Sequence, residues 1–134
     1  MQYKNKSYFI SDDRDDIQLE QVTSLLKSSY WAQDRSIETI KNSIHHSICF
    51  SLFFDDIQVG FARVVTDFAS VAYIADFIIQ AEHRSKGIGK WMFGVIVNDP
   101  RWSSKFQFLV TDDAHGLYER YGFSGSHKLM STGV

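Results

Sequence analysis

The chain has 134 residues, of which 44% are apolar and 15% aromatic, with a single proline. That much apolar surface excludes a disordered or low-complexity protein, and the length predicts one domain over residues 1–134. Fourteen basic and 16 acidic residues give a formal charge of −2, which argues against a protein that binds nucleic acid by neutralising phosphates. The single cysteine, Cys49, excludes an internal disulfide and a cysteine-rich zinc site.

Signals for export, membrane insertion and metal binding are all missing from the sequence. The polar start, residues 1–7, is not followed by the apolar stretch of a secretory leader, and no uncharged apolar run approaches the roughly 20 residues of a spanning helix. His45 and His46 stand together, but other ligand types at metal spacing do not accompany them. We therefore expect a soluble, cytoplasmic protein with no metal and no membrane partner.

The first half of the chain predicts a short strand, two helices and a β-hairpin. Residues 8–10 suit a strand, and the acidic cluster that follows precedes apolar residues spaced three and four apart, which predicts a helix over about residues 15–28. Ser36 is placed to cap a second helix that carries a stripe of isoleucines. Residues 48–54 and 57–66 are rich in β-branched and aromatic types and are separated by two aspartates, which predicts the hairpin.

The second half alternates strands with helices. Residues 71–80 are nearly all apolar apart from Asp76, which is typical of a strand covered on both faces. A glycine-bearing loop and four further elements follow: a helix over about 87–97, a strand over 106–111, a helix over 113–121 and a last strand near 128–131. Because this alternation is confined to the second half, we predict a mixed α/β fold and not a doubly wound Rossmann sheet.

The loop after the third long strand is suited to bind an anion. A strand runs into a loop that contains Gly87 and Gly89, and a helix leaves that loop at once. This arrangement directs unpaired backbone N–H groups and the positive end of the helix dipole at one point, and glycine lets an anion approach closely. Three basic residues add charge that suits a pyrophosphate: Arg84, Lys86 and Lys90.

Two common phosphate-binding motifs do not match this loop. A dinucleotide-binding turn needs G-x-G-x-x-G, but the next glycine after Gly89 is Gly94, two positions too late. Gly89 and Gly94 have the spacing of a Walker A loop, yet Val95 and Ile96 stand where that motif needs a lysine and a hydroxyl residue.

The loop instead fits R-x-x-G-x-G, here R-S-K-G-I-G at residues 84–89, and resembles the acetyl-CoA pyrophosphate loop of the GNAT superfamily of N-acetyltransferases. Residues 117–123, L-Y-E-R-Y-G-F, look like the L-Y-x-x-x-G-F element of the same family at its usual distance downstream. The match covers roughly residues 71–123. It implies a GNAT-type fold, a central and mostly antiparallel sheet with a splayed strand pair, flanked by helices.

The resemblance implies acetyl-CoA as the co-substrate. By position, pantetheine would lie beside the strand before the loop and bond to the backbone of Phe77, Ile78 and Ile79. Arg84 would hold the loop. The residues that would wrap the pyrophosphate, mainly through N–H groups, are Ser85, Lys86, Gly87, Ile88, Gly89 and Lys90.

The resemblance also implies two catalytic candidates. Tyr118 matches the family's tyrosine that protonates the departing CoA thiolate; the alternative is a packed tyrosine whose hydroxyl is merely satisfied. Asp76 is a lone carboxylate in an apolar strand, where desolvation would raise its pKa and suit it to be the base. Its alternative role is structural hydrogen bonding.

Acceptor specificity is expected in the connection between the first two helices, because loops carry specificity. There Asp34 could recognise an ammonium group, and Tyr30 and Trp31 could form a wall; the alternative is that the aromatics belong to the core. Residues 111–113 stand where the family commonly has an asparagine, and Asp113 is suited to cap the last helix.

Taken together, the resemblance implies an acetyl-CoA-dependent N-acetyltransferase that acts directly on a primary amine of a small molecule or a peptide. The alternative is a non-catalytic acyl-CoA-binding module that acts as a sensor. Turnover with an amine would separate the two, since both bind the cofactor. A homodimer paired through the last strand is left open by the sequence.

Overall fold

The computed structural model describes residues 2–112 and 115–133, and one sheet runs through it. The strands lie in chain order and are β1 (Gln2–Asn5), β2 (Tyr8–Ser11), β3 (Ile48–Phe54), β4 (Ile57–Thr66), β5 (Val71–Ile79) and β6 (Phe106–Phe108). Neighbouring strands are antiparallel except β5 and β6, which are parallel. The mixed α/β fold predicted from the order of elements, and the mostly antiparallel sheet that the resemblance implied, are thus confirmed.

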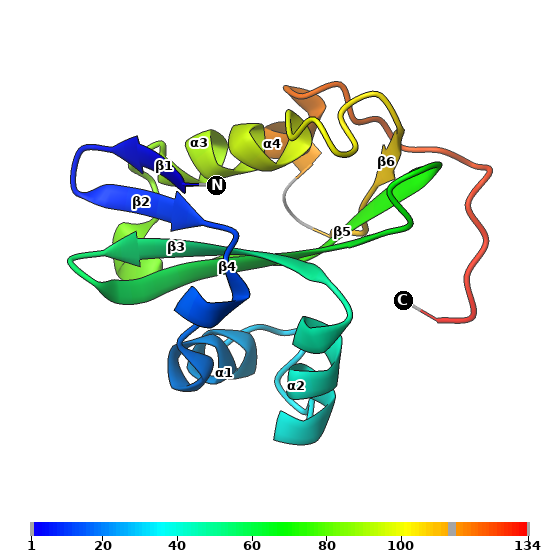
Figure 1. Cartoon of the computed structure of the whole chain (residues 1–134). Coiled ribbons are helices and arrows are strands. Elements are labelled where there is room, and N and C mark those ends of the chain that lie inside the picture. Colours follow the sequence, from blue (N-terminus) through cyan, green and yellow to red (C-terminus); the bar gives the residue numbers. More distant parts are fainter. Residues whose placement is uncertain (1, 113–114, 134) are drawn as a thin grey trace.

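Helices cover both faces of the sheet. They are α1 (Leu19–Lys27), α2 (Ile37–His45), α3 (Ile88–Val97) and α4 (His115–Glu119), with short 3₁₀ turns at η1 (Arg14–Asp16) and η2 (Ala81–His83). In Figure 1, α1 and α2 lie below the sheet, and α3 and α4 lie above it. Within the described residues, no helix has the length and apolar character needed to cross a membrane.

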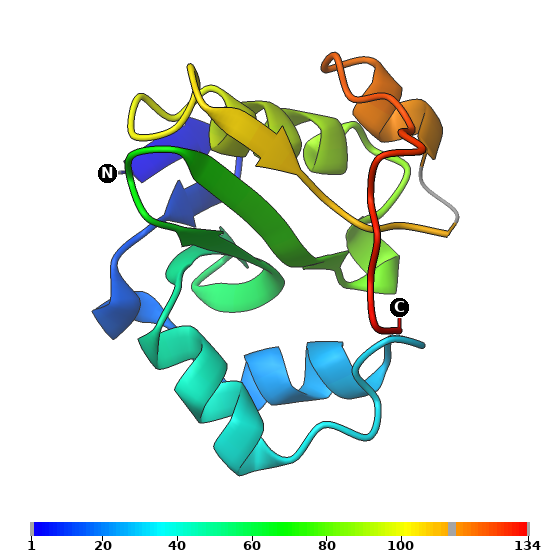
Figure 2. The ribbon, with the colours of Figure 1, turned by 90° about the vertical axis from the view of Figure 1, so that its right-hand side faces the viewer.

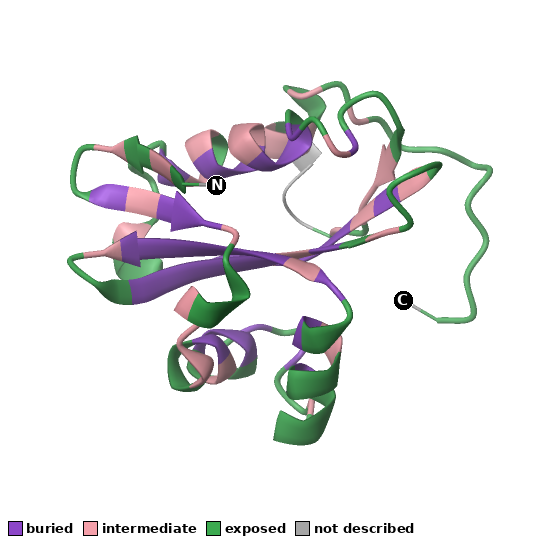
Figure 3. Ribbon diagram, viewed as in Figure 1, coloured by how far each residue is buried: buried purple, intermediate pink, exposed green. Residues whose placement is uncertain are grey.

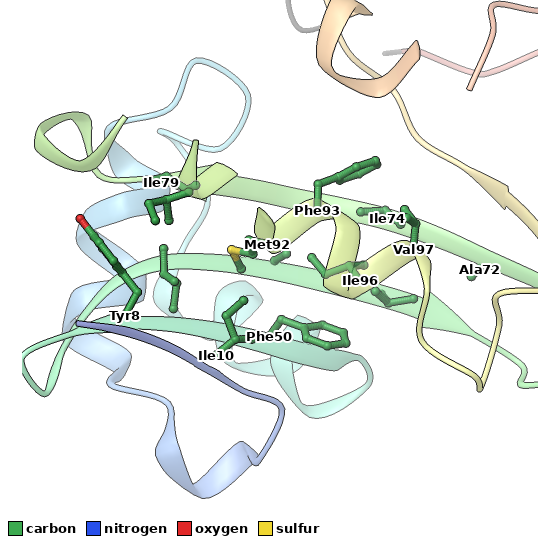
Figure 4. Packing of buried hydrophobic residues seen from close by; sticks show 14 of the residues in the cluster. Tyr8, Ile10, Phe50, Ala72, Ile74, Ile79, Met92, Phe93, Ile96 and Val97 are labelled. Atoms are coloured by element: carbon green, nitrogen blue, oxygen red, sulfur yellow. The ribbon is translucent and has the colours of Figure 1, made fainter. Parts of the chain in front are cut away.

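Two cores result from this layering. On the upper face, Met92 and Ile96 of α3 lie against Ile10 and Phe50 of the sheet, all fully buried (Figure 4). On the lower face, α1 and α2 pack on Phe61 and on other sheet residues in a smaller cluster. Figure 3 shows the buried residues concentrated in the central strands and on the inner sides of the helices. Buried area of this kind is the main favourable term in folding.

A β-bulge interrupts the pairing of β4 with β5 next to Asp76. Phe61 pairs with Ile78, but Arg63 pairs with Ala75, so one strand contains an extra residue there. Asp76 has a φ of 54°, an unusual value for a residue other than glycine. Strict alternation would put residues 74 and 78 on one face, yet Ile74 packs in the upper core and Ile78 in the lower one.

The pairing of β5 with β6 is short, and the two segments separate beyond it. Val71 to Tyr73 pair with Phe106 to Phe108, and then residues 74–79 and 109–112 line opposite walls of a cleft. This is the splayed strand pair that the resemblance implied. After α4 the chain descends along the side of the molecule without a helix or strand (Figure 2).

Several element boundaries differ from the sequence-based prediction. The first helix begins at Leu19 and not at residue 15, because residues 14–16 form a 3₁₀ turn that Asp13 caps through Asp15 N. The strand predicted at residues 128–131 is wrong, since that segment has no regular structure. The polar strand β1 was not predicted, because it pairs with β2 through its backbone and has no alternating apolar pattern. Asp113 lies outside the described residues.

Candidate active site

A cleft of about 720 Å³ runs along the open side of β5. One wall is β5 from Tyr73 to Ile79, and the opposite wall is the chain after β6 together with Leu117 and Tyr118 of α4. The loop before α3 lines one part of the cleft, and the connection between α1 and α2 lines another. We call these the loop end and the helix-connection end. The cleft therefore joins the two sequence motifs to the segment expected to determine specificity.

The loop at this end is held in place by the side chain of Arg84 and by backbone hydrogen bonding. Arg84 Nε donates to the carbonyl oxygen of Ile79 at 2.7 Å, which fixes the loop against the end of β5. Gly87 has a φ of 79°, a left-handed conformation that favours glycine. The first helical bond of α3 runs from Trp91 N to Gly87 O at 3.1 Å, so the amides of the three intervening residues precede the helical ladder.

The absence of a side chain at Gly89 leaves space in which a phosphate group could bind. This residue lines the cleft, and a Cβ built on it would lie 3.2 Å from Ile79 Cδ1. A side chain there would therefore crowd the narrow space between the loop and β5. Free amides, a helix N-terminus and a glycine wall together suit a pyrophosphate. The described residues of this loop thus fit the group that acetyl-CoA would place there.

The structure separates the predicted cofactor residues into two sets. The residues that line the cleft are Phe77, Ile78, Ile79, Arg84, Ser85 and Gly89. Lys86 and Ile88 instead line a separate concavity of about 340 Å³ beside Tyr8. The side chain of Lys90 is exposed, and Gly87 serves the turn. Binding through these last four residues stays a prediction that involves their backbone.

Tyr118 lies against the cleft within a cluster of aromatic rings. Its ring centroid is 4.8 Å from that of Phe93 and 6.5 Å from that of Phe77. The turn after α4 is fastened to α3, since Tyr121 Oη donates to the carbonyl oxygen of Lys90 at 2.6 Å. Gly94 permits this approach, because a Cβ there would lie 3.0 Å from Tyr121 Oη. The turn of the sequence motif is thus held against α3 next to Tyr118, whose acid role stays a prediction.

Asp76 lies at the helix-connection end and is held by three donors. Arg35 Nη1 and Arg63 Nε each lie 2.7 Å from Asp76 Oδ2, and Trp31 Nε1 donates to Oδ1 at 3.1 Å. The Asp76 side chain is only 3% exposed. Arg63 is fixed further, because its Nη1 donates to Ser47 Oγ at 3.1 Å. A carboxylate in the sheet therefore gathers charges from β4 and from the helix connection.

The pKa of Asp76 moves in the direction opposite to the sequence-based expectation. Burial acts to raise the pKa of this carboxyl, but the hydrogen bonds and charges of Arg35 and Arg63 outweigh burial and lower the pKa below its ordinary value. A carboxylate that binds a proton weakly is a poor base at neutral pH. This environment favours the alternative, structural hydrogen-bonding role.

The acceptor residues expected in the helix connection are only partly brought together. Tyr30 and Trp31 line the cleft, with ring centroids 5.1 Å apart, and the two residues are 54% and 42% exposed, so they lie on its surface and not in the core. Asp34 is exposed and lies outside the residues that line the cleft. Thr111 and Asp112 line the opposite wall. His115 belongs to the same short helix as Tyr118, and its side chain lies outside the described part of the chain.

The sequence places Arg35 in the acceptor segment without a role of its own, and Arg63 was not predicted to belong to the site. Arg63 is a lone charge in the apolar strand β4, just as Asp76 is in β5, and the two strands are neighbours in a predicted antiparallel sheet. Opposite lone charges in adjacent strands were the signal that could have paired them. Among the described residues, no group of three or more histidine, cysteine or acidic side chains could hold a metal.

Comparisons with known proteins agree with this geometry. The family model described as an acetyltransferase (GNAT) domain matches residues 45–125. A Gibberella zeae protein assigned by name to the acetyltransferases is 27% identical over 131 residues, covering 81% of this chain and 74% of that protein.

Solved structures extend the likeness to almost the whole chain. The crystal structure of a GNAT-family protein from Xanthomonas campestris is 34% identical, with a TM-score of 0.89 over 95% of this chain and 93% of that one. A Clostridium acetobutylicum protein crystallised with acetyl-CoA has a TM-score of 0.69 at 16% identity, covering 98% and 95% of the two chains. At that identity the second likeness concerns the fold alone.

Proposed function

The chain belongs to the GNAT family of acetyltransferases, and from this premise we propose that it transfers an acetyl group from acetyl-CoA directly to a primary amine of a small molecule or a peptide. The observation that carries the proposal is a single cleft that is lined by the glycine loop, by Tyr118 and by the aromatic pair Tyr30 and Trp31. A cofactor and an acceptor could therefore meet along the edge of β5.

In such a transfer, different residues of the cleft would bind the cofactor and donate a proton. When bound, acetyl-CoA supplies a thioester, so an amine forms the new C–N bond as the C–S bond breaks. The loop amides after Gly87 and the backbone of β5 would hold the cofactor's phosphates and its pantetheine arm. The amine loses one proton as the amide forms, while the Tyr118 hydroxyl would give its proton to the leaving sulfur and be restored by the proton that the amine releases. Direct transfer needs no nucleophile from the enzyme, and none is assigned.

The test is release of CoA from acetyl-CoA by the purified protein, followed with a thiol reagent across a panel of primary amines. The proposal predicts release that depends on both the protein and an amine, with the acetylated amine identified by mass spectrometry. Binding of acetyl-CoA without release for any amine would contradict the proposal and favour a non-catalytic acyl-CoA-binding module.

A further inference from the structure

The helix-connection end of the cleft carries an excess of positive charge. Its charged side chains among the described residues are Arg35, Arg63 and Asp76, which is two guanidinium groups against one carboxylate. The cleft as a whole is also lined by Arg84 and by the exposed Asp112, so its lining carries three guanidinium groups against two carboxylates. An acceptor that enters the cleft therefore meets a site with one uncompensated positive charge.

Arg35 and Arg63 differ in how many of their donors are already used. Arg63 is 13% exposed, and its Nε and Nη1 donate to Asp76 and Ser47. Arg35 is 22% exposed, and within the part of the chain that the structure describes only its Nη1 donates, to Asp76. The Nε and Nη2 donors of Arg35 are left for a ligand.

The surroundings of Arg35 keep it in place for such a ligand. Asp76 fixes one edge of its guanidinium group, and Trp31, bonded to the same carboxylate, lines the cleft nearby. A held guanidinium with free donors matches the two oxygens of a carboxylate better than a flexible lysine does. Because Asp76 is already bound to two guanidinium groups, it is poorly available to bind an ammonium group of its own.

We propose that the acceptor amine also carries a carboxylate, as an amino acid does, and that Arg35 binds this carboxylate while Asp76 and Arg63 position Arg35. This inference rests on the proposed acetyl transfer and names its substrate class. Polyamines and other polycationic amines are disfavoured, because their additional charges would meet the same two guanidinium groups.

Matched acceptors test the inference directly. The protein is assayed for CoA release with α-amino acids and with the corresponding α-amides, which keep the amine and the side chain but lose the negative charge. Putrescine and spermidine serve as the cationic comparison. The preferred amino acid is expected to have a kcat/KM at least about tenfold above that of its amide, since a charge-assisted pair is lost in the amide. Equal or faster turnover of amides or polyamines would overturn the inference.

Two variants locate the effect at Arg35. Arg35→Lys keeps the positive charge beside Asp76 but removes the paired N–H donors of the guanidinium group. Arg35→Gln removes both the charge and these paired donors. In each, the acid-to-amide ratio of kcat/KM is expected to fall toward one, mainly through KM for the acid. Lys41→Gln removes a charge from the exposed side of α2 and should leave the ratio unchanged. If Arg35→Lys is folded and its acid-to-amide ratio of kcat/KM is unaltered, Arg35 does not bind the carboxylate of the acceptor.

A binding measurement separates failure of this inference from failure of the proposed function. Melting temperatures are compared with the N-acetyl amino acids and with their N-acetyl amides. A shift with an acid, absent with its amide and lost in Arg35→Lys, supports the carboxylate site even if no amine gives CoA release. Equal shifts, or no shift with any acid, overturn the inference whether or not acetyl transfer is found.

Discussion

The loop end of the cleft is assembled from residues that are close in sequence, whereas the helix-connection end is assembled from side chains of three distant segments. The loop end uses the stretch from Phe77 to Lys90, and its main groups are backbone amides and glycines. The other end joins Trp31 and Arg35 to Asp76 across 45 and 41 residues of chain. Under the proposed function, local backbone geometry would bind the co-substrate, and long-range side-chain contacts would bind the acceptor.

The largest expected effect comes from removing the charge that organises the helix-connection end. Asp76→Asn leaves two partly buried guanidinium groups without their carboxylate and should lower the free energy of unfolding by about 3 kcal/mol. Urea unfolding at pH 7 measures this loss. Asp56→Asn, in an exposed turn, is the control and should change stability by less than about 0.5 kcal/mol.

The same variant has a defined dependence on pH. Because the pKa of Asp76 is lower in the folded protein than in the unfolded chain, its stabilisation is complete above the unfolded pKa of about 3.9. It is lost as the pH falls through the folded pKa. The difference in stability between wild type and Asp76→Asn should therefore shrink below about pH 4. A difference that stays constant down to pH 2 would contradict the account of Asp76.

The next largest effect is expected from removing the proposed proton donor, Tyr118. Tyr118→Phe removes the proposed proton donor and keeps the ring that packs on Phe93, so kcat should fall about 100-fold, equivalent to about 2.7 kcal/mol. The affinity for acetyl-CoA should stay the same. Tyr8→Phe removes a hydroxyl that is bonded to His83 and does not line the cleft, so it should leave kcat unchanged. An undiminished kcat in Tyr118→Phe would remove this residue from the mechanism.

The smallest effect isolates the loop end. Gly89→Val places a branched side chain between the loop and Ile79, so the Kd for acetyl-CoA should rise about tenfold, or about 1.4 kcal/mol. Isothermal titration measures it. Gly125→Ala, where a Cβ meets nothing within 4 Å, is the matched control. If both variants bind acetyl-CoA as wild type does, the cofactor does not pass beside Gly89.

The loop end of the cleft could be predicted from the sequence, whereas the contacts of the helix-connection end could not. Residues 84–89 and 117–123 are contiguous motifs, so their letters alone indicate the loop, the helix after it and the place of Tyr118. The partners of Asp76 depend instead on a one-residue bulge that sets the register of Arg63, and on how α1 and α2 pack. Neither leaves a periodic signal in the sequence. The predicted rise in the Asp76 pKa is wrong for this reason, because it considered burial without the two arginines.

The most direct test of the account is the melting temperature of the protein with and without acetyl-CoA, with NAD and ATP as controls. A ligand at about 100 times its Kd adds roughly 2.7 kcal/mol to the stability of the folded state. For a chain of this size, that is an increase of several degrees. The account predicts this increase with acetyl-CoA, its absence with NAD and ATP, and a smaller increase in Gly89→Val. No increase at millimolar acetyl-CoA would contradict the assignment of the glycine loop as the cofactor end of the cleft.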